Sequence, residues 1–161
     1  MTSTTQGSAA VAPLWHAAYP APKIEAPSLT RETVLEMLRD GNNVSGRDFV
    51  LVDLRRNDHE GGSIRGSINL PAQSLWSTIP IVYEMFKAAG LRKVIWFCGR
   101  VFTWSRKSCC RLFADHIAER GDTRMQSLVL LEGIKGWATA GEEYVQWMDE
   151  YDEAVWHKSK S

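Results

Sequence analysis

The sequence lacks the features that mark several classes of protein. Its three cysteines, Cys98, Cys109 and Cys110, cannot form a disulfide framework, and adjacent Cys109 and Cys110 pair only under strain. Residues 1–12 lack the basic start and apolar core of a secretory signal. No stretch approaches the roughly 18 consecutive apolar residues of a membrane helix. We therefore expect no membrane association, and a location in the reducing cytoplasm or the nucleus.

The chain also lacks net charge, because 19 lysines and arginines balance 19 aspartates and glutamates. No overall field favours nucleic acid or an anionic membrane, so any anion site must be local. The seven tryptophans are scattered without a basic patch, which indicates core packing rather than a platform for bases. No Cys/His spacing indicates zinc, and neither a metal nor a cofactor is expected.

Length and composition predict one domain, since 161 residues with 44% hydrophobic content can bury a sizeable core. Residues 1–22 are rich in Ser, Thr, Ala and Pro and show no hydrophobic period, which predicts a disordered arm that Trp15 and Tyr19 attach to the domain. The domain is expected over 23–157, with a disordered tail at 158–161.

Three apolar runs predict an α/β fold. They span 49–53, 93–97 and 127–131, and such unbroken runs are typical of strands covered on both faces in a parallel sheet. Helix-length segments separate them. We expect helices over 79–89, 107–120 and 141–151, and one that Thr30 caps and Gly41 ends in a left-handed turn.

Two motifs carry a resemblance to a known family. Asp53 to Pro71 contains Asp-Leu-Arg, Asp-His, Gly-Gly and then Gly-Ser-Ile-Arg-Gly-Ser-Ile-Asn-Leu-Pro, and Glu132 to Trp137 reads Glu-Gly-Ile-Lys-Gly-Trp. These resemble the signatures of the rhodanese superfamily, most closely its branch of M-phase inducer phosphatases and eukaryotic arsenate reductases. The resemblance implies a rhodanese-like three-layer fold, with a mostly parallel central sheet flanked by helices.

Within the first motif, we interpret Asp53, Arg55 and His59 as a buried polar network that holds a turn. The surrounding glycines and Pro71 serve backbone geometry, which indicates architecture rather than chemistry.

Cys98 is the candidate catalytic residue, because it follows the strand 93–97 and precedes a loop that leads into a helix. Loop N–H groups and a helix N-terminus there stabilise a thiolate and an oxyanion. The competing interpretation is a small buried residue that ends a strand. In the resembling families this cysteine attacks phosphorus, arsenic or sulfur, which implies that Cys98 is the nucleophile.

The loop after Cys98 departs from the family pattern. The resemblance implies C-x4-R for sulfur transfer or C-x5-R for phosphate and arsenate, but Thr103 and Trp104 occupy these arginine positions. Neither carries the charged fork that binds two oxygens of a tetrahedral anion. The expected substrate-binding residues are Gly99, Arg100, Val101, Phe102, Thr103, Trp104, Ser105 and Arg106.

A local frameshift or a mispredicted splice junction between Arg100 and about Leu112 is our hypothesis for this departure. With suitable third bases, codons for Val101 to Arg111 can be read one base later, without a stop, as Ser-Ser-Arg-Gly-Arg-Gly-Ser-Arg-Ala-Ala-Gly. Placed directly after Cys98-Gly99, with the extra residue Arg100 dropped, that reading restores C-x5-R. Cys109 and Cys110 are then accidents of frame; otherwise they are a buried helix face or the resolving thiols of a redox cycle.

The expected reaction is attack of Cys98 on phosphate or arsenate as a tetrahedral oxyanion, with glutathione or a similar thiol reducing the arsenic adduct. One alternative is transfer of sulfane sulfur through a Cys98 persulfide. Another is a catalytically inactive module with this fold that binds a partner or an anion. No motif selects a general acid among Asp115, Glu119 and Asp122.

Overall fold

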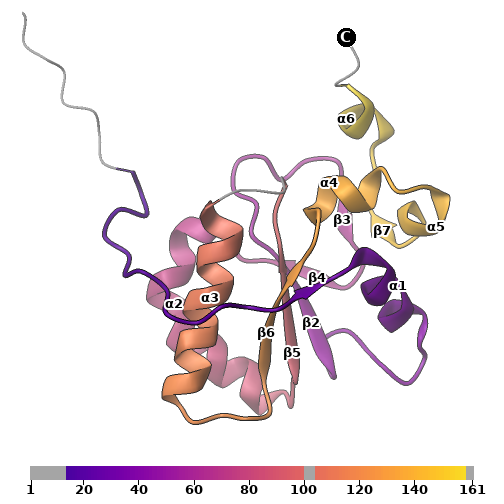
Figure 1. Cartoon of the computed structure of the whole chain (residues 1–161). Helices are drawn as coiled ribbons and strands as arrows, with labels where there is room; N and C mark the ends of the chain where they lie inside the picture. Colours follow the sequence, from indigo (N-terminus) through magenta and orange to yellow (C-terminus); the bar gives the residue numbers. More distant parts are fainter. Residues whose placement is uncertain (1–13, 100–103, 159–161) are drawn as a thin grey trace, which may run out of the picture.

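The computed structural model describes residues 14–99 and 104–158, with only the backbone for residues 104–107 (Figure 1). The predicted disorder at 1–13 and 159–161 lies outside these residues. Residues 14–22 form turns without a helix or strand, and two side chains attach them to the domain, as predicted. The Tyr19 hydroxyl donates to the carbonyl oxygen of Gln73 at 2.7 Å, and Trp15 packs against the core.

A five-stranded parallel sheet forms the middle of the molecule. The strand order is β1-β6-β5-β2-β4, so β5 is central. The strands are β1 (Ser28–Leu29), β2 (Phe49–Asp53), β4 (Ser67–Asn69), β5 (Lys93–Phe97) and β6 (Gln126–Leu130). The three apolar runs predicted as strands are β2, β5 and β6. They occupy the inner positions, which explains why their residues are apolar on both faces.

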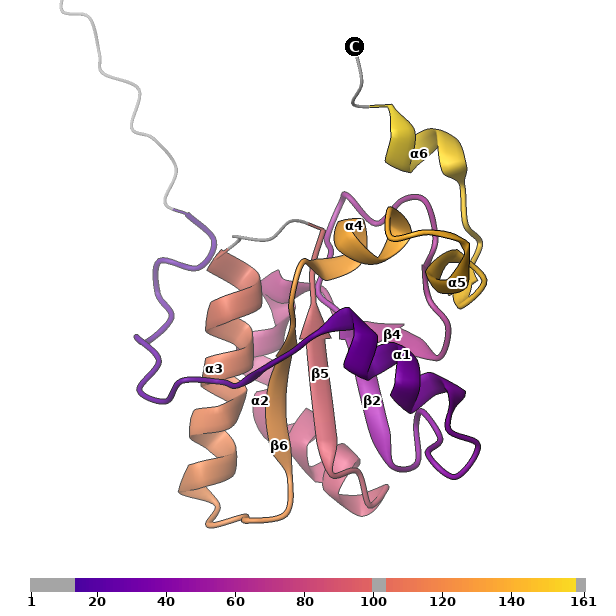
Figure 2. The ribbon, with the colours of Figure 1, turned by 45° about the vertical axis from the view of Figure 1, so that its right-hand side comes forward.

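Helices cover both faces of the sheet (Figure 2), which confirms the predicted three-layer α/β fold. One face packs against α2 (Ala72–Ala88) and α3 (Trp104–Glu119), and the other against α1 (Arg31–Arg39), α4 (Gly133–Ala138) and α5 (Glu142–Val145). Residues of β5 alternate between the two cores: Val94 and Trp96 join the first, and Ile95 and Phe97 join the second. A small antiparallel pair, β3 (Ser63–Ile64) with β7 (Met148–Asp149), and α6 (Glu153–His157) complete the described chain.

Helix α1 confirms the predicted cap and corrects the predicted end. Thr30 precedes it, and the Thr30 hydroxyl accepts the Thr33 N–H at 3.2 Å. The helix ends at Arg39, and Gly41 does not adopt a left-handed conformation. Asp40 ends the helix instead, because its extended backbone donates to the Glu36 carbonyl while its carboxylate accepts the Asn42 N–H.

Two other helix predictions were wrong in extent. Helix α2 begins at Ala72 rather than near Ile79, because Ala72 and Leu75 are buried while the polar residues between them face outward. The helix predicted over 141–151 is only the short α5, followed by β7 and by Glu150 with a φ of 56°. Helix α3 begins at Trp104, slightly before its predicted start at 107.

Candidate active site

Cys98 follows the central strand at the carboxyl edge of the sheet, where ligands of open α/β sheets bind. Its backbone is fixed from both sides. The Ile134 N–H donates to the Cys98 carbonyl oxygen at 3.0 Å, and the Leu54 N–H donates to the Phe97 carbonyl oxygen at 2.8 Å. The thiol side chain is buried, with 5% of the residue exposed. Cys98 therefore sits in a rigid position between the segments that follow β6 and β2.

The turn that joins β6 to α4 requires a glycine next to this cysteine. Glu132 and Gly133 both have left-handed backbones, with φ values of 64° and 60°. A Cβ at position 133 would overlap the carbonyl oxygen of Cys98. Gly133 thus lets the first turn of α4 approach the cysteine backbone, which gives the Glu-Gly motif a physical reason.

Asp53 and Arg55 form the buried network that the sequence predicted. Their side chains are each 1% exposed, and the Arg55 Nη2 lies 2.7 Å from the Asp53 Oδ2. The guanidinium also donates to the carbonyl oxygens of Glu60 and Gly62, both at 2.7 Å. His59, predicted as a buried member of this network, is instead 39% exposed, with its Nε2 3.4 Å from the same carboxylate oxygen. Arg55 is therefore committed to the turn and does not supply the cation that the loop lacks.

Gly62 shows that the motif glycines serve this turn. Its φ is +86°, and a Cβ would overlap the carbonyl oxygen of Asp149. The indole N–H of Trp156 in α6 donates to the Gly61 carbonyl at 2.8 Å. The turn is thus closed between the buried ion pair on one side and the C-terminal segment on the other.

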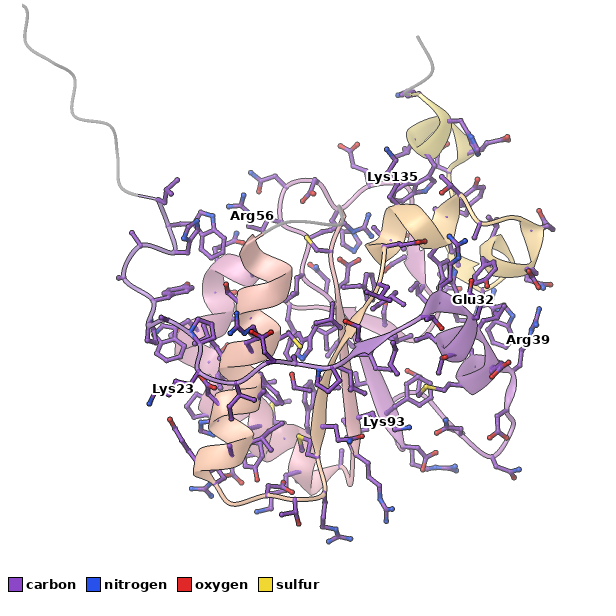
Figure 3. The ribbon with its side chains drawn as sticks, in the orientation of Figure 1. Lys23, Glu32, Arg39, Arg56, Lys93 and Lys135 are labelled. Carbon is purple, nitrogen blue, oxygen red and sulfur yellow. The ribbon has the colours of Figure 1, made fainter. Side chains whose placement is uncertain are left out.

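A cavity of about 550 Å³ opens beside Gly99, at the mouth of the site. Its wall carries charges of both signs, from Asp58, Glu60, Lys135 and Lys158. Figure 3 places Lys135 and Arg56 at this edge, well away from Lys93 at the opposite one. The cavity is therefore open and polar, whereas Cys98 does not line it and is buried in the core cluster that contains Cys109 and Cys110.

Asp58 is the acid next to Gly99, the described residue of this loop, and the sequence did not predict it as a general acid. A Cβ built on Gly99 would be 3.1 Å from the Asp58 Oδ2. Asp115, in contrast, accepts the N–H groups of Lys23 and Ile24 along α3, and Asp122 lies near the other edge of the sheet. The acid–His pair in the first motif was the only signal that could have identified Asp58.

The structure brings only part of the predicted substrate loop into view. Gly99 lines the mouth cavity. Residues 100–103, which include the first candidate arginine position, lie outside the described part of the chain, as do the side chains of Trp104, Ser105 and Arg106. The backbone of Trp104 begins α3, so a helix N-terminus follows the loop, as predicted. Such an N-terminus favours a nearby anion.

Cys109 and Cys110 lie on the buried face of α3, with exposed fractions of 2% and 0%. Burial, together with the neighbouring Cys110 and Cys98, raises the pKa of Cys109 to about 12. Because the thiolate is the form that attacks disulfides and electrophiles, a thiol with this pKa is inert near neutral pH. The geometry therefore favours a core role for Cys109 over a resolving role in a redox cycle.

This burial leads to a labelling prediction. In the folded protein near neutral pH, iodoacetamide is expected to modify Cys109 at least tenfold more slowly than in urea-unfolded protein. The raised pKa of Cys109 lowers the fraction of reactive thiolate, because each pKa unit reduces that fraction about tenfold. Peptide mass spectrometry after timed quenching measures the rate at each cysteine. Equal rates in the folded and unfolded states would show that Cys109 is accessible and reactive.

No membrane or metal feature appears in the described chain. Across residues 14–99 and 104–158, no helix combines the length and apolarity required to cross a bilayer. Within the same residues, no group of three or more His, Cys, Asp or Glu side chains is arranged to hold a metal ion.

Comparison with known proteins identifies the fold. No protein-family model and no curated protein sequence matches the chain. A Saccharomyces cerevisiae homolog of single-domain rhodanese and the Cdc25 phosphatase catalytic domain superposes with a TM-score of 0.62 at 17% identity, covering 84% of this chain and 95% of that one. The As-Sb reductase of Leishmania major superposes with a TM-score of 0.57 at 17% identity, covering 67% and 72%.

A second structure of the same yeast protein, described there as a protein tyrosine phosphatase of the Rhodanese family, has a TM-score of 0.59 at 18% identity, covering 84% of this chain and 99% of that one. At these identities the likeness concerns the fold. The chain therefore has a rhodanese-like fold, as the sequence motifs implied, and its structural neighbours include a phosphatase homolog and an arsenic and antimony reductase.

Proposed function

We propose that this rhodanese-like chain is built for cysteine-dependent chemistry on a tetrahedral oxyanion, as a phosphatase or an arsenate reductase. The position of Cys98 carries the proposal. Cys98 lies at the carboxyl end of the central strand, and an N–H group of α4 holds its backbone. The loop that follows Cys98 leads into α3. The N-terminus of α3 follows this loop, and such a helix end favours a bound anion.

In the phosphatase reaction, the Cys98 thiolate attacks phosphorus and a sulfur–phosphorus bond forms as the bond to the leaving oxygen breaks. The leaving oxygen takes a proton from an acid at the mouth, and Asp58 beside Gly99 is placed for this role. Water then attacks phosphorus, which releases phosphate and regenerates the thiol.

In the arsenate reaction, the thiolate displaces water from protonated arsenate and forms a sulfur–arsenic bond. A thiol of the glutathione class then attacks the Cys98 sulfur, so that arsenic leaves with the bonding electron pair as arsenite. A second thiol reduces the mixed disulfide, and the two thiols supply both electrons. The open cavity of about 550 Å³ beside Gly99 has room for such a donor.

One observation favours a second candidate, a non-catalytic binding module. The loop after Cys98 has Thr103 and Trp104 where the resembling family has arginine. The buried Arg55 cannot replace that arginine, because its guanidinium is bound to Asp53 and to two carbonyl oxygens. Without a guanidinium, charge that develops on the oxyanion is stabilised only by N–H groups. The two candidates therefore differ in turnover rather than in fold.

The Cys98→Ser variant separates these candidates. We expect the unmodified chain to show slow turnover of p-nitrophenyl phosphate, or of arsenate with glutathione, and we expect Cys98→Ser to lose at least 100-fold of it, because serine is a far weaker nucleophile near neutral pH. Released nitrophenol and arsenite are measured, and thiosulfate sulfurtransferase activity is assayed in parallel.

Cys109→Ser is the matched control, since it makes the same change at a buried thiol outside the proposed chemistry. Circular dichroism first establishes that both variants are folded. Turnover that survives Cys98→Ser would remove this cysteine from the mechanism. No turnover in any assay supports the binding module, and activity confined to thiosulfate supports sulfur transfer.

A further inference from the structure

A second cavity, of about 500 Å³, lies at the amino edge of the sheet, opposite Cys98. The segments that join α2 to β5 and α3 to β6 form its walls, and Figure 2 shows the turn from α3 to β6 at the far end of the sheet from α4. Four cationic side chains line it, and two buried apolar residues contribute to its floor. These residues are Lys87, Arg92, Arg120, Arg124, Leu91 and Met125.

The carboxylate in this lining, Asp122, is already occupied by protein donors. The Tyr83 hydroxyl donates to its Oδ2 at 2.9 Å, and the N–H groups of Arg124 and Met125 donate to its Oδ1 at 2.8 and 3.2 Å. The bond from the Arg124 N–H is the main reason that the pKa of Asp122 is lowered. Asp122 is therefore held by the turn and faces Lys87, which offsets its negative charge, and three arginines remain in the lining.

Capping of helix ends, a common role for basic residues, is performed by the backbone here. At the end of α2, the N–H groups of residues 89–91 donate to the carbonyls of Met85, Lys87 and Phe86. At the end of α3, those of residues 120–122 donate to the carbonyls of residues 116–118. The side chains of Lys87 and Arg120 are thus not required as hydrogen-bond caps, although their charges still favour the helix dipoles.

The arginine side chains also have little competition from acids. Arg120 contacts Glu84 at 2.9 Å, but both side chains are 50% exposed, and such surface pairs are weak. With the residues that the structure describes, the side chains of Arg92 and Arg124 form neither an ion pair nor a hydrogen bond. Arg92 also faces Asp48, but that carboxylate is already paired with Arg47 at 2.7 Å, so both guanidinium groups keep donors for a ligand.

We infer that this cavity is a binding site for a ligand that carries two or more phosphate groups. One guanidinium group can bind two oxygens of a phosphate group at once. Several cations around one cavity therefore match a ligand with several linked phosphates better than a single phosphate ion. The chemistry fits a free oligophosphate and equally the headgroup of a phosphorylated lipid. The site is separate from the Cys98 mouth, because the two lie at opposite edges of the sheet.

Calorimetric titration of the full chain with tripolyphosphate tests the inference, with inorganic phosphate as the single-phosphate comparison. We expect tripolyphosphate to bind at least tenfold more tightly than inorganic phosphate. Arg92→Gln and Arg124→Gln are each expected to weaken binding about tenfold, and the double variant about 100-fold, in line with the loss of charge-assisted hydrogen bonds. Both arginines are exposed, so the variants leave the core intact.

Arg39→Gln is the matched control, since it removes the same charge from an exposed arginine on α1, away from the cavity (Figure 3). It and Cys98→Ser are expected to bind tripolyphosphate as the unmodified chain does, which separates this site from the proposed active site. Equal weakening in Arg39→Gln and in the double variant, or the absence of tripolyphosphate binding, would overturn the inference.

The source of the phosphates is distinguished by a vesicle arm. Phosphatidylcholine vesicles that contain phosphatidylinositol 4,5-bisphosphate are sedimented with the chain and with the double variant. Binding that the double variant loses assigns the site to a lipid headgroup. Tripolyphosphate binding without vesicle binding assigns it to a free oligophosphate.

Discussion

Turnover by the proposed active site is expected to rise about 100-fold or more when the loop after Cys98 is given the C-x5-R pattern. The variant carries Arg100→Ser, Val101→Ser, Phe102→Arg, Thr103→Gly and Trp104→Arg. The gain is expected because one donor aimed at the developing oxyanion contributes about 10²–10³ to the rate, and a guanidinium offers two such bonds. Steady-state assays with p-nitrophenyl phosphate and arsenate measure it.

The control for this variant keeps its other four substitutions and has Trp104→Gln in place of Trp104→Arg. It keeps Phe102→Arg and the small residues but lacks the arginine at the C-x5-R position, so it isolates the effect of the guanidinium at position 104. A gain of the same size in the control would show that the arginine at position 104 is not what limits turnover. A gain that persists when Cys98→Ser is added would exclude Cys98 as the nucleophile.

The nucleotide sequence between Phe97 and Phe113 bears on the same loop. A transcript that encodes Ser-Ser-Arg-Gly-Arg after Gly99 would show that the C-x5-R loop is the natural one. An uninterrupted message that encodes Val101 to Leu112 in frame rejects the frameshift hypothesis. In that case the missing arginine is a property of the protein, and the binding module becomes the stronger candidate.

Arg55→Leu is expected to destabilise the folded protein by about 3–5 kcal/mol. The substitution leaves the buried Asp53 without its cation and leaves the carbonyl oxygens of Glu60 and Gly62 without their donor. Urea unfolding followed by circular dichroism gives the change in the free energy of unfolding.

The comparison variant is Arg39→Leu, which removes an arginine whose contact with Glu143 is 3.4 Å long and largely exposed. We expect it to cost about 1 kcal/mol or less. A loss from Arg55→Leu no larger than this would show that the network around Asp53 contributes little to stability. The turn would then have to be held by its backbone and by α6.

The core strands could be predicted from the sequence because burial on both faces of a parallel sheet leaves an unmistakable apolar run, as in β2 and β5. The edge strand β4 gave no such signal, since Ser67 is only partly buried and Ile68 and Asn69 are exposed. The helix predicted over 141–151 was longer than the observed α5. Its apolar spacing does not show that Glu150 has a left-handed backbone or that Met148 pairs with Ile64. Those features depend on contacts far apart in the sequence.

The site was predictable where a motif fixes the backbone. Gly62, Asp53 and Arg55 have roles that follow from tight turns and a buried charge, and the structure places them together. The proximity of Asp58 to Gly99 was not predictable, because it depends on how the segment after β2 folds over the end of β5. The cationic cavity at the other edge was missed for a similar reason, since Arg92 and Arg124 belong to different connections.

The position of β1 at the sheet edge bears on how the chain folds during synthesis. Ser28 and Leu29 pair with Val129 and Leu130, so this strand finds its partner only after most of the polypeptide has left the ribosome. Until then the nascent chain can assemble β2 with β5 through the intervening α2, but the edge of β5 remains open. Closure of the sheet by such distant pairing is slow compared with local helix formation, so the unfinished edge stays open to wrong strand pairing in the meantime.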